Sequence, residues 1–137
     1  MAAAPARRGG GGLSLCLALA GVVKTLSLAA FTLAWTHSIE KTEWQEDWRV
    51  TPAGLELVQA RVKGFGAGME PPSDARLVGG WFQWQPKRAP LPELALGNSG
   101  AAGEWHLCSD GNCRTLSEIF GHPIGANVTT MRACDNP

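Results

Sequence analysis

Large and small side chains alternate with a period of two residues from Phe31 onward. The positions between the large side chains hold threonine, alanine and serine. Because successive side chains of a β-strand point to opposite faces, this pattern predicts a strand with one heavy face over residues 31–39. The heavy face carries Phe31, Leu33, Trp35, His37 and Ile39.

The alternation continues in the next two segments. Trp44, Glu46, Trp48 and Val50 are separated by glutamine, aspartate and arginine, which predicts a second strand antiparallel to the first. The sequence "TPAG" ends this strand, and a third is expected over residues 55–62. We therefore interpret "WTHSIEKTEWQEDW" as a β-hairpin whose tryptophans and histidine build the core. Its acids lie around the turn, where charge discourages sheet edges from aggregating.

Short strands separated by glycine and proline are also expected in the second half. "ARLVGGWFQWQP" indicates two strands joined at Gly79-Gly80, and brief strands are expected at residues 93–96 and 104–108. Thr115 and Glu118 are spaced as a capping box, which predicts helical turns over residues 116–120. The predicted fold is all-β: a small antiparallel β-sandwich or partly open β-barrel of about six to eight strands, with one short helix near the C-terminus.

Residues 1–20 have the three-part layout of a secretory signal peptide. Two arginines precede an apolar run at residues 13–19, and the run leads into Ala-Leu-Ala, a small-x-small cleavage pattern. The alternative is an uncleaved membrane anchor extending to about residue 35, although Lys24 would then lie near the middle of the bilayer. Either case places the domain outside the cytoplasm, with membrane contact through the N-terminal segment. In a bacterium this is the periplasm, or the inner membrane with the domain facing the periplasm.

Length and charge limit what the rest of the chain can do. With 137 residues it can form one domain, expected at residues 21–123 and followed by a C-terminal tail at residues 124–137. Its 12 basic and 12 acidic residues give no net charge, whereas nucleic-acid-binding domains carry a basic surface. Nucleic acid is therefore excluded as a partner.

The cysteines fit an oxidising compartment. In "LCSDGNCR", Cys108 and Cys113 flank a turn, so they can meet across a hairpin and form a disulfide that contributes about 2 kcal/mol. Zinc is the alternative, but a structural zinc site uses four ligands and only one cysteine pair is present. Cys16 would be removed with the signal peptide, which leaves Cys134 free or able to displace one partner of the local pair.

The glycines of "KGFGAGMEPP" raise the question of a phosphate-binding loop. Their spacing matches neither G-x-G-x-x-G nor G-x-x-x-x-G-K-[ST], and Pro71-Pro72 stand where a helix should begin. We therefore expect no nucleotide and no other cofactor. The segment is interpreted as a strand edge that opens into an irregular loop.

Metal binding and catalysis both have weak support in the pattern. His37 and Glu40, with His106, contain ligand types that suit zinc, but residues 37 and 40 of one strand point to opposite faces. A buried, hydrogen-bonded His37 is the favoured interpretation. No G-x-S-x-G motif or Ser-His-Asp frame occurs, so we expect the protein not to be an enzyme.

The tryptophans either fill the core or form a ligand platform. We expect about four or more of the six in the core, and a partly exposed patch at Trp44, Glu46 and Trp48, which share one strand face. The candidate ligand- or partner-binding residues are His37, Glu40, Trp44, Glu46, Trp48, Glu70 and Arg76.

Four segments in a fixed order resemble a known family. They are "HSIEKTEWQEDWRV", "GFGAGMEPP", "GWFQWQP" and "LCSDGNCRTLSE". From about Trp35 to Phe120 they resemble DUF1850, a bacterial family of unknown function, although Phe82 stands where a second tryptophan often follows Trp81.

The resemblance implies a short exported protein of a kind commonly encoded beside TRAP-type transporters of the TAXI class, with no established activity. We therefore expect a periplasmic accessory of such a transporter, which acts by protein contact or by helping to handle the solute. The implied partner is the TRAP membrane subunit or the solute-binding protein. The alternative is an independent small-ligand or metal-binding module.

Overall fold

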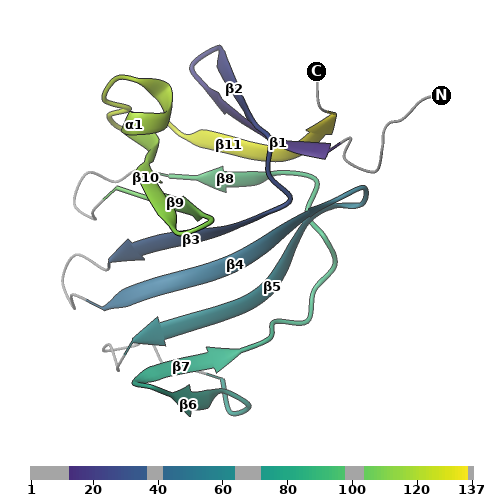
Figure 1. Ribbon diagram of the computed structural model, residues 1–137, viewed down its shortest axis with the longest axis vertical. Helices are drawn as coiled ribbons and strands as arrows, with labels where there is room; N and C mark the ends of the chain where they lie inside the picture. Colours follow the sequence, from purple (N-terminus) through teal and green to yellow (C-terminus); the bar gives the residue numbers. More distant parts are fainter. Residues whose placement is uncertain (1–12, 37–41, 64–71, 98–103, 136–137) are drawn as a thin grey trace.

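The described residues of the protein form two antiparallel β-sheets and one short helix (Figure 1). The computed structural model describes residues 13–36, 42–63, 72–97 and 104–135. The smaller sheet contains, in spatial order, β2 (Val22–Leu26), β1 (Leu13–Leu19), β11 (Thr129–Asp135) and β8 (Leu94–Leu96). The larger sheet contains, in spatial order, β10 (Asn112–Thr115), β9 (His106–Ser109), β3 (Ala30–Thr36), β4 (Glu43–Thr51), β5 (Gly54–Lys63), β7 (Trp81–Trp84) and β6 (Arg76–Val78). The helix α1 (Leu116–Phe120) follows β10, and the all-β prediction with a short helix near the C-terminus is confirmed.

The hydrophobic core lies between the inner faces of the two sheets. The smaller sheet contributes alternate residues of β1, and α1 buries three apolar side chains against the same cluster. The members from the larger sheet are Phe31, Leu33, Trp48, Val50, Leu55, Leu57 and Leu107. Burying each large apolar side chain contributes about 1.5–3 kcal/mol. All of these larger-sheet residues come from β3, β4, β5 and β9, so the buried core does not extend to β6 or β7.

The predicted first hairpin is confirmed in its described part. β3 and β4 pair antiparallel with Phe31 opposite Trp48 and Trp35 opposite Trp44, and β4 in turn pairs with β5. The register between β4 and β5 shifts at Asp47/Trp48, where β5 carries one extra residue. The turn at residues 37–41, with His37 and Glu40, lies outside the described residues.

The expectation for the tryptophans is wrong. Trp48 is buried, with 2% of its surface exposed, but the other five are only half-buried. Strand periodicity assigned side chains to the correct face of the larger sheet. Periodicity could not show that the four-stranded sheet covers only part of the seven-stranded sheet. Tryptophans on the uncovered part of the larger sheet therefore remain partly exposed.

The expected domain limits also need correction. β1 lies between β2 and β11 in the smaller sheet, and Cys16 forms a disulfide with Cys134. In the full chain, residues 13–19 thus form a strand of the smaller sheet, and the expected tail at residues 124–137 contains β11. A short apolar run has the same pattern in a signal peptide and in a buried strand, so periodicity does not separate them. Cleavage itself stays a prediction.

The membrane-anchor alternative predicted a helix through the same region. Residues 13–36 instead contain the strands β1, β2 and β3. No helix among the described residues is long and apolar enough to cross a membrane.

The local predictions around α1 are confirmed. Cys108 and Cys113 are opposite each other in the β9–β10 hairpin and form a disulfide. The Thr115 hydroxyl accepts from the Glu118 N–H at 3.1 Å, and the Glu118 carboxylate accepts from the Thr115 N–H at 2.8 Å. The latter hydrogen bond lowers the pKa of Glu118. Gly121, with φ 83°, ends the helix in the left-handed conformation that glycine favours.

The two disulfides close loops of very different length, which gives a testable difference in stability. Cys16 and Cys134 are 118 residues apart, whereas Cys108 and Cys113 are 5 apart. Because loop-closure entropy grows with loop length, replacing the first pair by serine should lower the free energy of unfolding by about 4–5 kcal/mol, and replacing the second by about 2 kcal/mol. Denaturant unfolding of the two double variants measures both.

Peptide mapping of the exported protein without reductant is the control for this comparison. It should yield a linked peptide that contains Cys16 and Cys134. A mature chain that begins after Ala20 would lack Cys16 and would contradict the role of β1 in the native fold.

Candidate functional site

Four half-buried tryptophans pack together on the inner face of the larger sheet, and we call them the tryptophan cluster. They are Trp35, Trp44, Trp84 and Trp105. Ring centroids lie 5.8 Å apart for Trp35 and Trp44, 4.4 Å for Trp35 and Trp105, and 6.2 Å for Trp44 and Trp84. Such pairs contribute about 0.5–1.5 kcal/mol each beyond their burial. The cluster is therefore a rigid aromatic surface that remains partly open to solvent.

Strand pairing brings these side chains together. Trp35 on β3 is directly opposite Trp44 on β4. On the far side, Ala60 of β5 is opposite Trp84 of β7, and its small side chain leaves Trp84 room to reach Trp44 edge-on. Trp105 precedes β9, and its Nε1–H donates to the Gly97 carbonyl at 2.9 Å. The cluster thus draws on β3, β4, β7 and the segment before β9.

The Nε1–H of Trp44 is a buried donor without an acceptor among the described residues. Leaving such a group unpaired costs about 1–3 kcal/mol, so buried donors are nearly always satisfied. An acceptor for this N–H must therefore come from another part of the chain, from solvent or from a bound molecule. Within the described residues, this donor therefore adds no hydrogen bond to the stability of the tryptophan cluster.

Glu46 places a carboxyl group on the same apolar face. It shares the inner face of β4 with Trp44 and Trp48, and it accepts a hydrogen bond from Trp48 Nε1 at 3.2 Å. Burial raises the pKa of Glu46, and the hydrogen bond from Trp48 and the positive charge of Arg88 oppose this effect only in part. The aromatic surface therefore adjoins a carboxyl group that is more easily protonated than an exposed glutamate.

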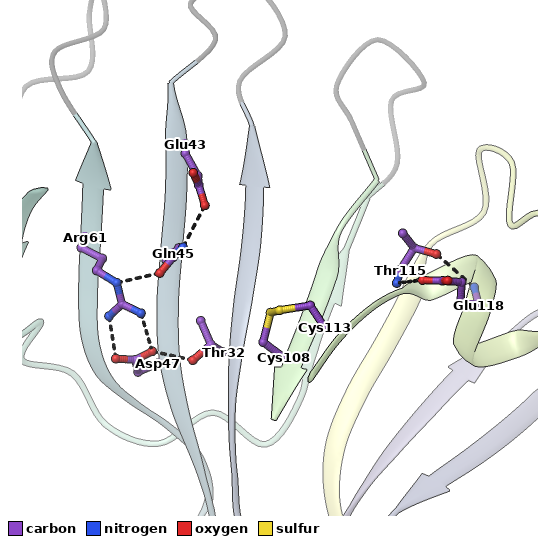
Figure 2. Close-up of a disulfide and its surroundings, with 9 residues drawn as sticks. All are labelled: Thr32, Glu43, Gln45, Asp47, Arg61, Cys108, Cys113, Thr115 and Glu118. Carbon is purple, nitrogen blue, oxygen red and sulfur yellow. Dashed lines mark hydrogen bonds and ion pairs between the residues drawn. A yellow bond between two sulfur atoms is a disulfide. The ribbon is translucent and has the colours of Figure 1, made fainter. Parts of the chain in front are cut away.

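The opposite, outer face of the larger sheet carries a connected polar network (Figure 2). Arg61 on β5 donates to both carboxylate oxygens of Asp47 on β4, at 2.7 and 3.2 Å, and to Gln45 at 2.7 Å. Gln45 donates to Glu43 at 2.8 Å, and Thr32 on β3 donates to Asp47 at 2.6 Å. Every member of this network has a partner, which is the arrangement expected of a stabilising polar network.

Asp47 has the opposite pKa shift to its neighbour Glu46. Burial raises the pKa of Asp47, but hydrogen bonds from Arg61 and Thr32 and the charge of Arg61 outweigh burial, so the pKa lies below its usual value. Asp47 is therefore ionised at neutral pH, and its hydrogen bonds link β4 to β3 and β5.

The Cys108–Cys113 disulfide lies beside this network in Figure 2. Thr32 on β3 is directly opposite both Cys108 on β9 and Asp47 on β4. The strand β3 therefore separates the disulfide from Asp47. Cys113 is exposed. The disulfide joins β9 to β10 at the edge of the larger sheet, where β10 has no strand on its other side.

The predicted site residues divide between the two faces. Trp44, Glu46 and Trp48 share the inner face, but Trp48 is buried and cannot contact a ligand. Arg76 on β6 is exposed and is opposite Gln83, whose side chain contacts Gln59 on the outer face, so Arg76 does not join the tryptophans. His37, Glu40 and Glu70 lie outside the described residues.

Sequence reasoning missed Trp35, Trp84 and Trp105 as surface residues. The pairing of Trp35 with Trp44 was available from the hairpin, because both belong to the heavy face. The approach of Trp84 and Trp105 depends on contacts between distant segments. Within the described residues, no group of three or more histidine, cysteine, aspartate or glutamate side chains is arranged to hold a metal ion.

The outer network gives a prediction for Asp47. Replacing Asp47 by Asn should lower the free energy of unfolding by about 1–2 kcal/mol at neutral pH, because it weakens charge-assisted hydrogen bonds that are partly screened by solvent. The pKa of Asp47 is lowered on folding, so its contribution is present above the usual aspartate pKa and is lost as pH falls through the folded value. Denaturant unfolding at several pH values measures this loss.

The matched control is the exposed pair of Arg49 and Glu56. These side chains are 57% and 38% exposed and meet at 2.9 Å. Glu56→Gln should therefore cost well under about 1 kcal/mol. Equal losses for Asp47→Asn and Glu56→Gln would show that the outer network adds nothing beyond a surface ion pair.

Glu46 should behave in the opposite way. Replacing Glu46 by Gln should raise the free energy of unfolding at neutral pH by up to about 1 kcal/mol, because it removes a buried charge while keeping an acceptor for Trp48. Below the usual glutamate pKa the carboxyl group is protonated in both states, so the gain should vanish. Unfolding at neutral and acidic pH tests this, and Glu93→Gln at an exposed site should change little.

Comparison with known proteins assigns most of the chain to one family. No significant match was found among curated proteins or among solved structures. The sequence profile described as Domain of unknown function (DUF1850) matches residues 31–116, which include the whole tryptophan cluster, the outer network and the Cys108–Cys113 disulfide. Because this match covers more than half of its 137 residues, the chain belongs to the DUF1850 family.

Proposed function

We propose that the protein is an exported periplasmic accessory of a TAXI-type TRAP transporter, and that the tryptophan cluster contacts a protein component of the transporter. The contact surface is inferred from the group of four half-buried tryptophans and from the Nε1–H of Trp44, which has no acceptor among the described residues. The partner is the membrane subunit or the solute-binding protein. The transporter class comes from the family resemblance, which is an associational argument.

The chemistry of the cluster supports protein contact. Tryptophan is enriched in protein interfaces and dominates binding energy at their centres, because it buries a large area and loses little side-chain entropy. Rings that already stack on one another are ordered before binding, which reduces the entropic cost of association. A backbone carbonyl of a partner is the kind of group that accepts from an indole N–H.

Two further features support an exported protein. Cys16–Cys134 and Cys108–Cys113 form disulfides, and disulfides are typical of oxidising compartments outside the cytoplasm. A metal at the tryptophan cluster has less support than a protein partner, because indole groups are not metal ligands and Glu46 offers only one carboxylate. The proposal assigns no catalytic step to the protein.

Co-purification tests the proposal. A tagged form of the full chain, expressed with the TAXI-type TRAP genes of the same genome, should capture the membrane subunit or the solute-binding protein. Trp44→Ala should weaken this capture about tenfold or more, because it removes the ring that joins Trp35 to Trp84.

Trp81→Ala is the matched control for the interface variant. Trp81 is also half-buried, but it lies on the outer face, where Lys63 Nζ sits 5.8 Å from its ring centroid. The Trp81→Ala variant should leave the capture of the transporter component unchanged. Thermal unfolding of Trp44→Ala and Trp81→Ala confirms that both variants are folded. Failure of the wild-type chain to capture any TRAP component would refute the transporter role, and equal loss in both variants would refute the proposed surface.

A further inference from the structure

An open groove of about 420 Å³ lies at the β6–β7 edge of the larger sheet. Its polar lining comes from Gln59, Asp74, Arg76, Gln83, Gln85 and Lys87. The volume falls within the range of sites that bind small molecules. The groove shares Trp84 with the tryptophan cluster, and its polar lining residues lie outside that cluster.

The glutamines of the groove are oriented by their own contact. Gln59 Nε2 donates to Gln83 Oε1 at 3.1 Å, so the oxygen of Gln83 is already engaged. The amide NH₂ of Gln83 takes no part in this contact and can donate to a ligand, and Gln83 is opposite Arg76 in the β6–β7 pairing. A ligand at this position meets N–H donors from two neighbouring strands.

Among the described residues, no ion pair neutralises the positive charges of the groove. Within the described part of the chain, the ion pairs join Arg49 to Glu56 and Arg61 to Asp47, so neither Arg76 nor Lys87 is paired with a carboxylate. Asp74 is the one acid in the lining, which gives the groove a formal charge of two cations minus one anion, or +1. An anionic ligand is thus favoured, and Asp74 can accept a hydrogen bond from it.

We propose that this groove binds a small organic acid that carries a hydroxyl or ammonium group near its carboxylate. Arg76, Lys87 and the NH₂ of Gln83 hold the carboxylate through charge-assisted hydrogen bonds. Asp74 accepts from the hydroxyl or ammonium group and repels a compact, purely anionic oxyanion such as sulfate. The inference does not depend on the transporter role or on the tryptophan cluster.

Calorimetric titration of the full chain with L-malate, succinate and sulfate tests this assignment. L-malate should bind saturably, succinate more weakly because it lacks the hydroxyl group, and sulfate should neither bind comparably nor compete. Arg76→Gln and Lys87→Gln should each weaken L-malate binding about tenfold or more, since each removes a charged donor. Asp74→Asn should reduce the preference for L-malate over succinate.

Lys24→Gln is the matched control, because it removes one positive charge from an exposed position on β2 of the other sheet. It should leave L-malate binding unchanged. Absence of saturable L-malate binding, sulfate binding as tight as L-malate binding, or equal losses in Lys24→Gln and Arg76→Gln would each overturn the proposal. All four substituted residues are exposed, so the variants should keep the wild-type unfolding temperature.

Discussion

The central constraint on this fold is that seven strands must bury one apolar face against four. Alternate side chains of β3, β4, β5 and β9 pack against β1 and α1, where leucines such as Leu33 and Leu55 are completely buried. The same alternation runs on into β7, but no buried member of the core cluster comes from that strand. The tryptophan cluster occupies this transition between covered and uncovered sheet, where a large ring can pack on its neighbours and still meet solvent.

Neighbouring residues on β4 show how the two faces differ. Glu46 and Asp47 are adjacent in the chain but point to opposite faces, and their pKa values shift in opposite directions. Glu46 lies among apolar rings with one indole donor, so burial dominates its titration. Asp47 receives donors from Arg61 and Thr32, which stabilise its charge. The titration of each carboxyl group is thus set by its burial and by the donors on its own face of the sheet.

Local features of the sequence predicted local structure well. The period of two placed β3, β4 and β5, the capping box at Thr115 placed α1, and the short spacing of Cys108 and Cys113 gave their disulfide. The N-terminal strand was missed because seven small and apolar residues fit a signal peptide equally well. The exposure of the tryptophans could not be predicted, since it depends on how far one sheet extends over another. Arg76 was proposed for binding, but its neighbours in the groove come from separate segments that no sequence spacing relates.

The two proposed binding surfaces lie on different parts of the larger sheet, and this separation bears on how they could work together. The tryptophan cluster is on the inner face, whereas Arg76 and Gln83 belong to the outer-face side of the β6–β7 edge. A protein bound at Trp44 would therefore contact the face opposite to Arg76 and Gln83. β7 links the two surfaces directly, because Trp84 contacts Trp44 and also borders the groove. If a partner shifts Trp84, the shape of the groove changes with it, so this side chain offers a direct route for coupling between partner and small acid.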